Sequence, residues 1–269
     1  PTLAGLRRRG FPPEAIVAFC EGLGVTRRES TVELARLEHA AREQLNRQAP
    51  RAFAVLEPLR LVVDNLTPEA TFRFEVPVNP EDPSAGHRTL SFGRELWVER
   101  ADFMLEPAPK YHRLSPGAEV RLRSAFLLRC TGVDLDPITG EVSCIHGEVD
   151  LASEGGQAPD GRKVKGTIHW LARDQALPAE VRLYDTLFSA ADPEASTDED
   201  FTACLNPHSL RLIQGAYVEP GLATAAPGAR LQFERQGYFV VDPDSRPGAL
   251  VFNRIVSLKD AWAKGGTQG

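Results

Sequence analysis

The sequence predicts a mainly β protein with a helical subdomain at its N-terminal end. Residues 1 to about 50 carry apolar side chains at helical spacing. From residue 52 onward, short runs of alternating apolar and polar residues are separated by turns rich in Pro, Gly and Asp. At least ten such runs are present, which is too many for one small barrel, so we expect two β-barrels.

The helical subdomain, residues 1–50, is expected to be compact. Pro12 and Pro13 predict a helix start, and Gly24 predicts a helix end. The apolar stripe comprises Ala15, Ile16, Phe19 and Leu23, and then Leu34, Leu37, Ala41 and Leu45 up to Pro50. The basic run Arg7, Arg8 and Arg9 is typical of a solvated surface, although phosphate contact fits it if RNA passes nearby.

The β part is expected to contain strands at residues 59–63, 71–76, 95–98, 118–130, 141–145, 162–170, 180–184, 210–213, 231–241 and 251–256. The loop at residues 106–110 and the acidic loop at residues 192–200 are the expected crossings between the barrels. No internal repeat of fixed period is present, so the barrels need not be duplicates.

The segment 160–170 combines a turn, an alternating strand and a cationic face. Asp160-Gly161 is a strong turn dipeptide. Alternation gives the following strand a polar face of Lys163, Lys165, Thr167 and His169, and an apolar face of Val164, Ile168 and Trp170. Contact with RNA phosphates suits this face, and so does a solvated edge strand whose lysines prevent aggregation.

A second cationic face is expected on residues 118–130. Alternation places Arg121, Arg123 and Arg129 opposite an apolar face. Between residues 110 and 129 there are five Lys or Arg and one acid, Glu119, so this region is basic inside an acidic chain. Arginines that bind phosphate and base edges explain such a patch, and a salt-bridge network with neighbouring carboxylates is the alternative.

Composition limits the classes of function. The hydrophobic content of 42% over 269 residues is that of a folded protein. The net charge of −6 is unlike that of a nucleic-acid binder, so RNA binding is argued only from local patches. The absence of an apolar run of eighteen residues and of a charged-then-apolar leader predicts a cytoplasmic protein without a membrane partner.

No residue pattern predicts catalysis or a metal site. The four cysteines lack the spacing of a zinc cage or a disulfide framework. His169 lies in a predicted strand without a nearby nucleophile, and the acids of residues 192–200 lack the spacing of a calcium loop. A glycine-rich phosphate loop is missing as well. Because the chain opens on Pro1, we interpret it as a fragment.

The segment 160–170 resembles a signature of the anticodon-binding region of glutaminyl-tRNA synthetases, and the resemblance covers nearly all of the chain. Further matching strings are Gly5-Leu-Arg-Arg-Arg-Gly10, Ala49-Pro-Arg-Ala52, Val120-Arg-Leu-Arg123, Glu180-Val-Arg-Leu-Tyr-Asp185, Gln232-Phe-Glu-Arg235 with Gly237-Tyr-Phe239, and Phe252-Asn-Arg254. In that family this region follows the catalytic Rossmann-type domain, whose two ATP-binding signatures are not found here. The resemblance implies a helical subdomain at 1–50, a proximal anticodon-binding barrel at 51–104 and 190–269, and a distal one at 105–189.

The resemblance also implies which residues face tRNA. It assigns to the anticodon-binding surface Arg51, Lys110, His112, Arg113, Arg121, Arg123, Gln232 and Arg235. Lys110 and His112 stand where the family carries Gln and Lys, yet both donate hydrogen bonds. Asn46, Lys163 and Lys165 are expected near the tRNA backbone. Gln232 and Arg235 are three residues apart, so a bulge or strand end must separate them if both contact RNA.

The function implied by the resemblance is anticodon recognition of glutamine tRNA within a glutamine–tRNA ligase. The intact enzyme would use ATP and Mg, whereas this chain alone is expected to be catalytically inactive, to need no cofactor, to bind no DNA and to be monomeric. Two alternatives stay open: the same region of an archaeal or eukaryotic-type glutamyl-tRNA synthetase, and a stand-alone RNA-binding barrel of the ribosomal type.

Overall fold

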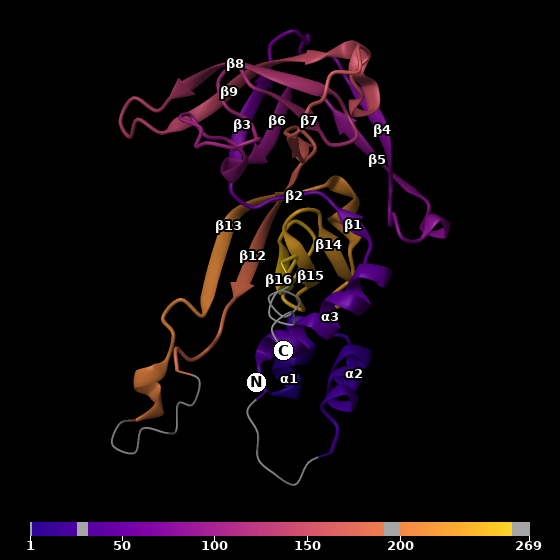
Figure 1. Cartoon of the computed structure of the whole chain (residues 1–269), viewed down its shortest axis with the longest axis vertical. Helices are drawn as coiled ribbons and strands as arrows, with labels where there is room; N and C mark the ends of the chain where they lie inside the picture. Colours follow the sequence, from indigo (N-terminus) through magenta and orange to yellow (C-terminus); the bar gives the residue numbers. More distant parts are fainter. Residues whose placement is uncertain (1, 26–31, 191–199, 260–269) are drawn as a thin grey trace.

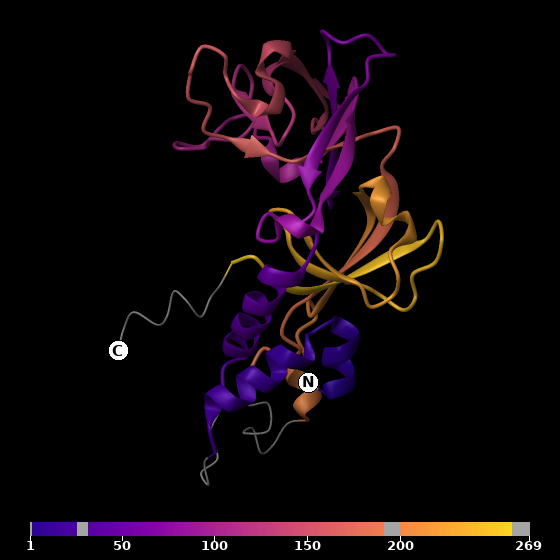
Figure 2. The ribbon, with the colours of Figure 1, turned by 90° about the vertical axis from the view of Figure 1, so that its right-hand side faces the viewer.

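The structure is a computed structural model that describes residues 2–25, 32–190 and 200–259. Three layers follow one another along its longest axis (Figure 1): a group of helices, a first sheet and a second sheet. The same order is visible after a rotation of 90° (Figure 2). The predicted class, mainly β with an N-terminal helical part and two barrel-like sheets, is confirmed.

The helical layer consists of α1 (Leu3–Arg9), α2 (Pro13–Leu23) and α3 (Leu34–Gln48). Gly10 ends α1 with a positive φ of 96°, and a Cβ atom there would lie 2.6 Å from Cβ of Val240. Only glycine therefore lets the end of α1 lie against the neighbouring sheet. Apolar side chains of the predicted stripe, Ala15, Leu37, Ala41 and Leu45, are buried in one cluster with Tyr238, Val240 and Ile255. No described helix has the length and apolar character needed to cross a membrane.

Sheet A, the middle layer, has seven strands in the order β1-β14-β15-β16-β12-β13-β2. Their bounds are β1 Arg51–Ala52, β2 Ala54–Val55, β12 Leu177–Tyr184, β13 Leu210–Val218, β14 Arg230–Phe233, β15 Gly237–Val241 and β16 Leu250–Ser257. Its core contains Phe233, Phe239 and Phe252, all fully buried.

Sheet B, the outer layer, also has seven strands, in the order β10-β7-β8-β9-β3-β6-β11. Their bounds are β3 Pro58–Val63, β6 Glu95–Glu99, β7 Glu119–Leu122, β8 Leu127–Leu135, β9 Val142–Asp150, β10 Thr167–Ile168 and β11 Trp170–Ala172. A separate hairpin, β4 (Phe72–Pro77) and β5 (His87–Phe92), covers its core through edge-to-face contacts of Phe74 and Phe92 with Phe126 and Trp170. The described chain also has short 3₁₀ turns: Pro83–Ala85, Arg100–Asp102, Leu151–Gly156, Phe201–Cys204 and Pro220–Thr224.

Sheet B is inserted into sheet A along the chain. The chain forms β1 and β2 of sheet A, then all of sheet B between residues 58 and 172, and then returns to sheet A with β12. The predicted domain boundaries group these strands differently, since they join residues 51–104 to 190–269. The difference arises because β3 pairs parallel with β9 and antiparallel with β6, which draws residues 58–99 into the sheet of β7 to β9.

The predicted crossing at residues 106–110 is wrong because it connects β6 to β7 within sheet B. The other predicted crossing, residues 192–200, lies outside the described residues except for Asp200. The chain crosses between the sheets instead at residues 56–57 and 173–176.

Three predicted strands are interrupted. Residues 118–130 form a hairpin rather than one strand, because Ser124 turns the chain with a positive φ of 62°. Arg129 consequently lies opposite Glu119 and not in line with Arg121 and Arg123. Residues 231–241 form the hairpin of β14 and β15, so a strand end does separate Gln232 from Arg235.

The predicted strand at 162–170 shrinks to Thr167–Ile168 and the start of β11 at Trp170. His169 is fully buried, so the predicted polar face does not extend that far. The lysines keep their exposure because the chain around them runs outside the sheet.

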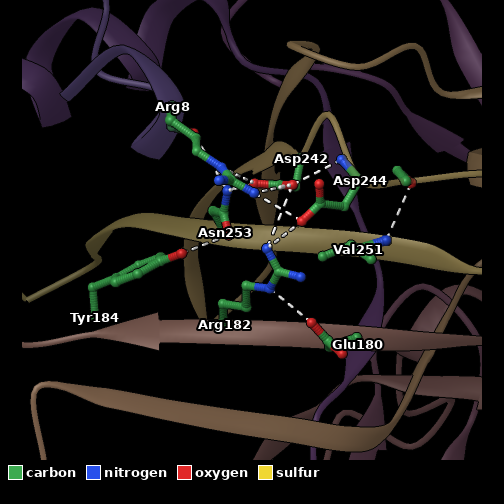
Figure 3. A network of polar contacts seen from close by, with 9 residues as sticks. Arg8, Glu180, Arg182, Tyr184, Asp242, Asp244, Val251 and Asn253 are labelled. Atoms are coloured by element: carbon green, nitrogen blue, oxygen red, sulfur yellow. Dashed lines mark hydrogen bonds and ion pairs between the residues drawn. The ribbon is translucent and has the colours of Figure 1, made fainter. Parts of the chain in front are cut away.

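A polar network fixes α1 on sheet A (Figure 3). Asp242, fully buried in side chain, accepts two hydrogen bonds of 3.2 Å from Arg8 and a short one from Asn253 Nδ2. Arg182 of β12 approaches the same carboxylate at 3.5 Å and pairs with Asp244 at 3.0 Å. Burial alone would raise the pKa of Asp242, but the Arg8 guanidinium, the Asp244 backbone N–H and the Asn253 amide lower it to about 2.

Candidate nucleic-acid interface

The two sheets meet at a junction where buried carboxylates face arginines. Asp102 follows β6 of sheet B and is 2% exposed. Across the junction, Arg235 lies in the turn between β14 and β15 of sheet A and adopts a positive φ of 68°. Its Nη2 donates to Oδ1 of Asp102 at 2.7 Å, and its Nη1 donates a shorter bond to Oδ2. This two-point contact fixes the plane of the guanidinium group.

Asp102 has a second arginine partner. Nη1 of Arg113 lies 3.1 Å from Oδ1 of Asp102 and also donates to the Ala101 carbonyl at 3.1 Å. The Arg113 side chain is 47% exposed, so part of its guanidinium group remains open to solvent. One buried carboxylate therefore brings together two residues that the sequence predicted on the anticodon surface.

Glu234 holds a third predicted residue. Its carboxylate accepts a short contact from Nε of Arg123 and pairs at 3.3 Å with Nη2 of Arg88 from β5. Arg88 also pairs with Glu219 at 3.1 Å and lies over the ring of Phe53, 5.3 Å from its centroid. Burial raises the pKa of Glu219, and the Arg88 charge opposes that rise.

His169 and Glu99 complete the junction. The Nε2–H of His169 donates to the Ala54 carbonyl at 2.7 Å, so Nδ1 is free to accept from Nη1 of Arg235 at 3.2 Å. Burial, helped by the Arg235 charge, lowers the pKa of His169 to about 4, which keeps the ring neutral. Glu99 accepts from the backbone N–H groups of Leu56 and Glu57 and from Gln236, and burial raises its pKa to about 7.

A second group of predicted residues surrounds Arg51. The parallel pairing of β1 with β14 sets Arg51 beside Gln232. Arg51 is 7% exposed, and its guanidinium donates to the Ala49 carbonyl at 2.8 Å and to both oxygens of Asn46 at 3.0 and 3.1 Å. Oε1 of Gln232 is buried and has no hydrogen-bond partner among the described residues. Gln232 therefore keeps an unused acceptor beside Arg51, whose guanidinium makes three hydrogen bonds.

The third group is an exposed basic edge of sheet B, formed by Lys110, His112, Lys163 and Lys165. A Cβ atom on Gly166 would lie 1.9 Å from the His112 carbonyl, so glycine allows the segments 110–113 and 163–167 to touch. Within the described part of the chain, none of the four side chains has an ion pair or a hydrogen bond. The basic edge thus presents the unpaired cations Lys110, Lys163 and Lys165 next to the junction, because His112 of the same edge directly precedes Arg113.

Arg121 makes a hydrogen bond to the backbone, and Arg162 forms ion pairs with acidic side chains. Nε of Arg121 donates to the Gly156 carbonyl at 2.6 Å. Arg162 pairs with Glu119, Asp150 and Asp160 at 2.8 to 3.0 Å, which raises the pKa of Arg162 further and neutralises the only acid between residues 110 and 129.

The structure therefore gathers all the predicted residues except Arg121 into three groups: Arg113, Arg123 and Arg235 at the junction, Arg51, Gln232 and Asn46 at β1–β14, and the basic edge. Their contacts with tRNA stay predictions. The acids that hold the arginines, Asp102 and Glu234, and the additional cation Arg88 were missed. Their signal in the sequence is weak, since Asp102 and Arg235 are 133 positions apart.

Comparison with known proteins agrees with the resemblance. Residues 49–150 and 167–242 match two family models, each described as the anticodon-binding domain of class I tRNA synthetases for glutamate and glutamine. Glutamine–tRNA ligase of Nitrobacter winogradskyi is 50% identical over 98% of this chain and 46% of its own length. Those of Bradyrhizobium diazoefficiens and Rhodopirellula baltica are each 48% identical over 98% of the chain, covering 47% and 44% of their own lengths. The chain spans about half the length of the curated relatives it matches.

Proposed function

We propose that this chain, which belongs to the family of anticodon-binding domains of class I glutamyl- and glutaminyl-tRNA synthetases, binds the anticodon loop of glutamine tRNA. Glutamine is favoured over glutamate because the similar full-length relatives are glutamine–tRNA ligases. The alternatives of a glutamyl enzyme and of a stand-alone ribosomal-type barrel have no comparable support.

One observation carries the proposal: Asp102 holds Arg113 and Arg235 together at the sheet junction. The family resemblance selects these arginines as anticodon residues, and the geometry independently brings them to one carboxylate. A guanidinium group held in a fixed plane presents its remaining N–H groups in a defined direction, which base recognition requires. Arg123, 41% exposed in side chain while paired with Glu234, fits the same description.

The other two groups would supply the rest of the interface. The solvent-facing N–H groups of Arg113 can bind the Watson–Crick edges of unstacked anticodon bases, and Gln232 would offer its unused Oε1 once a side-chain rotation exposes it. We assign Arg51 and Gln232 to the middle base, and Arg113 or Arg235 to the third. Arg121 would join Arg123 at the anticodon loop. The basic edge would bind phosphates, with Asn46 near the backbone on the other side.

Within a complete glutamine–tRNA ligase, this region would select the tRNA while the remaining part joins glutamine to it with ATP and Mg. The chain alone would then be inactive in that reaction, monomeric and cytoplasmic. Pyrophosphate exchange by the purified chain above background would contradict the inactivity.

The function is tested by measuring binding of this chain to glutamine tRNA and to the same tRNA with one exchanged anticodon base, at fixed salt. Each exchange of the second or third base is expected to weaken binding by roughly 1–3 kcal/mol, because directional hydrogen bonds are lost. Equal binding of both tRNAs would reduce the surface to an electrostatic contact. Tighter binding of glutamate tRNA or of ribosomal RNA would favour one of the alternatives.

A further inference from the structure

A cluster of metal-ligating side chains lies on sheet B, on strands that carry none of the tRNA-facing residues. In the pairing of β8 with β9, Asp134 lies opposite Cys144. In the pairing of β3 with β9, Val62 lies opposite His146, and Asp64 follows directly after β3. Because side chains alternate along a strand, Cys144 and His146 point to the same face of β9. Three separate segments thus bring a carboxylate, a thiol and an imidazole to one place.

The distances suit one shared cation. One ligand atom from each of Asp134, Cys144 and His146 lies within 4.8 Å of the others. Nε2 of His146 is 3.0 Å from Oδ2 of Asp134, somewhat shorter than the roughly 3.4 Å between two such ligands on a tetrahedral zinc ion, so a small separation of the two side chains would admit the ion. Cys144 is 4% exposed, whereas the side chains of His146 and Asp134 are 30% and 63% exposed. The outer side of the cluster is therefore open to an entering ion.

The His146 ring lies between two carboxylates, one at each ring nitrogen. Nδ1 lies 3.2 Å from Oδ1 of Asp64, so carboxylates face both ring nitrogens. Both carboxylates are satisfied either by an imidazolium or by a metal ion on Nε2 with Nδ1–H bonded to Asp64.

The donor set selects the kind of ion. Sulfur, imidazole nitrogen and one carboxylate oxygen suit a borderline ion such as Zn²⁺ better than Mg²⁺ or Ca²⁺, which prefer oxygen alone. Asp64 is placed to accept from Nδ1–H, the arrangement that commonly orients a metal-binding histidine. Arg60 lies opposite Cys144 in the pairing of β3 with β9, but its guanidinium pairs with Glu95 at 2.8 Å. Arg60 therefore does not neutralise the carboxylates of Asp64 and Asp134.

We propose that Asp134, Cys144 and His146 bind one zinc-type ion, with Asp64 as the positioning carboxylate and a water molecule as the fourth ligand. The ion would tie β8, β9 and the end of β3 together and so stabilise this side of sheet B. The site is independent of tRNA recognition. The spacing of the cysteines provided no signal for it, because its ligands come from different strands and include only one cysteine.

The experiment uses the complete chain, reduced and freed of metal with a chelator. Zinc binding is measured by competition with a chromophoric chelator, and cobalt substitution is followed by its thiolate-to-metal absorption band. We expect one zinc ion per chain, a cobalt–thiolate band, and a melting temperature that rises with zinc because the ion binds the folded state.

Variants assign the ligands. Cys144→Ser, His146→Gln and Asp134→Asn are each expected to weaken zinc binding more than tenfold, and Asp64→Asn about tenfold because it acts through His146. Cys204→Ser and His208→Gln are matched controls, since both residues lie elsewhere in the chain, and they should leave zinc affinity unchanged. Asp134→Asn changes an exposed side chain, so it tests the site even if Cys144→Ser disturbs folding.

Three results would overturn the proposal. The first is the absence of stoichiometric zinc binding by the unaltered chain, which would mean that a proton alone lies between His146 and Asp134. The second is zinc binding without a cobalt–thiolate band. The third is equal affinity in the Cys144→Ser and Cys204→Ser variants, which would assign the metal to adventitious sites.

Discussion

The arginines of the sheet junction and the lysines of the basic edge carry the same charge but are held in opposite ways. Arg113, Arg123 and Arg235 each have a buried carboxylate partner. Lys110, His112, Lys163 and Lys165 are exposed and, within the described residues, have no polar partner. The salt-bridge alternative considered for the basic patch therefore holds at the junction and fails at the edge.

The difference separates two tasks of an RNA-binding surface. A paired arginine is oriented before the ligand arrives, so less rotamer freedom is lost when it binds a base. A free lysine binds phosphate in many geometries, and its contribution to affinity weakens as salt rises. Specificity is thus expected from the junction, and salt-dependent affinity from the edge.

The largest effect is expected from Asp102→Ala. It removes the partner of Arg235 in a buried pair, and such losses cost about 3–5 kcal/mol. Because Arg113 and Arg235 reach solvent in part, we expect the lower end of that range in the free energy of unfolding, measured with urea. The matched control is Asp244→Ala, whose carboxylate is 52% exposed and pairs with Arg8 and Arg182. If Asp244→Ala lowers the free energy of unfolding as much as Asp102→Ala, the buried carboxylate of the junction does not contribute more than an exposed one.

The pH dependence of stability should reveal two buried groups that act in opposite directions. The pKa of Glu99 rises on folding from 4.5 to about 7. Its contribution to the free energy of unfolding is therefore fully present below pH 4.5 and is lost as the pH rises to 7. The pKa of His169 falls from 6.5 to about 4, so its contribution is present above pH 6.5 and is lost as the pH falls to 4. Each change is worth about 3 kcal/mol, and the two oppose each other between pH 4.5 and 6.5.

Glu99→Gln removes the opposing titration of Glu99, so the pH dependence of stability that comes from His169 should become measurable. The variant should lose stability, relative to the unaltered chain, as the pH falls from 6.5 to 4.5, and urea unfolding at several pH values measures this. The corresponding substitution at the exposed edge, His112→Gln, is the control and should not alter the profile in that way. Parallel profiles for Glu99→Gln and the unaltered chain would contradict the opposing pH dependences assigned to Glu99 and His169.

Arg235→Ala and Arg123→Ala should each weaken binding of glutamine tRNA by about 1–3 kcal/mol when the arginine reads a base. The loss should shrink with a tRNA whose anticodon is exchanged, because that tRNA no longer offers the base that the arginine recognises. Arg129→Ala is the control, since Arg129 is exposed and lies on the next strand opposite Glu119. Equal and negligible losses at all three positions would leave only a structural role for the junction arginines.

The smallest effect is expected from Lys163→Gln and Lys165→Gln. Each should lower affinity for all tRNAs alike and reduce the slope of log affinity against log salt by about one for every phosphate that the lysine neutralises. Filter binding at four salt concentrations measures the slope. A loss confined to one anticodon would move specificity to the edge and reverse the comparison.

Sequence patterns predicted the strands better than their partners. Alternation identified β3, β6, β9, β12 and β16, but alternation fixes the faces of a strand and not its neighbours. The insertion of sheet B into sheet A was therefore missed. Two tight turns were also missed, because Ser124 and Arg235 adopt positive φ without the glycine that normally marks such a turn.

Only the arginines and Gln232 of the candidate site were predictable, and the carboxylates that hold the arginines were not. The resemblance supplied its arginines and Gln232, whereas Asp102 and Glu234 are ordinary acids in sequence and gain their role when two sheets meet. His169 was interpreted as structural, and its contacts with Ala54 and Arg235 across the junction agree with that interpretation. The free acceptor of Gln232 depends on burial, which spacing along the chain does not specify.

The insertion of one sheet into the other has a consequence for synthesis on the ribosome. Every strand of sheet B has been made by residue 172, whereas sheet A needs β16 at Leu250–Ser257 for its centre. Helix α1 likewise cannot form its contact with sheet A until late, since Arg8 bonds Asp242, which lies 234 positions further along the chain. Sheet B can therefore fold during translation, while β2 has no partner strand in sheet A until β13 emerges and β1 has none until β14 emerges. The junction that we assign to the anticodon would then be among the last parts of this region to form, so nascent chains would acquire tRNA specificity only near completion of this region.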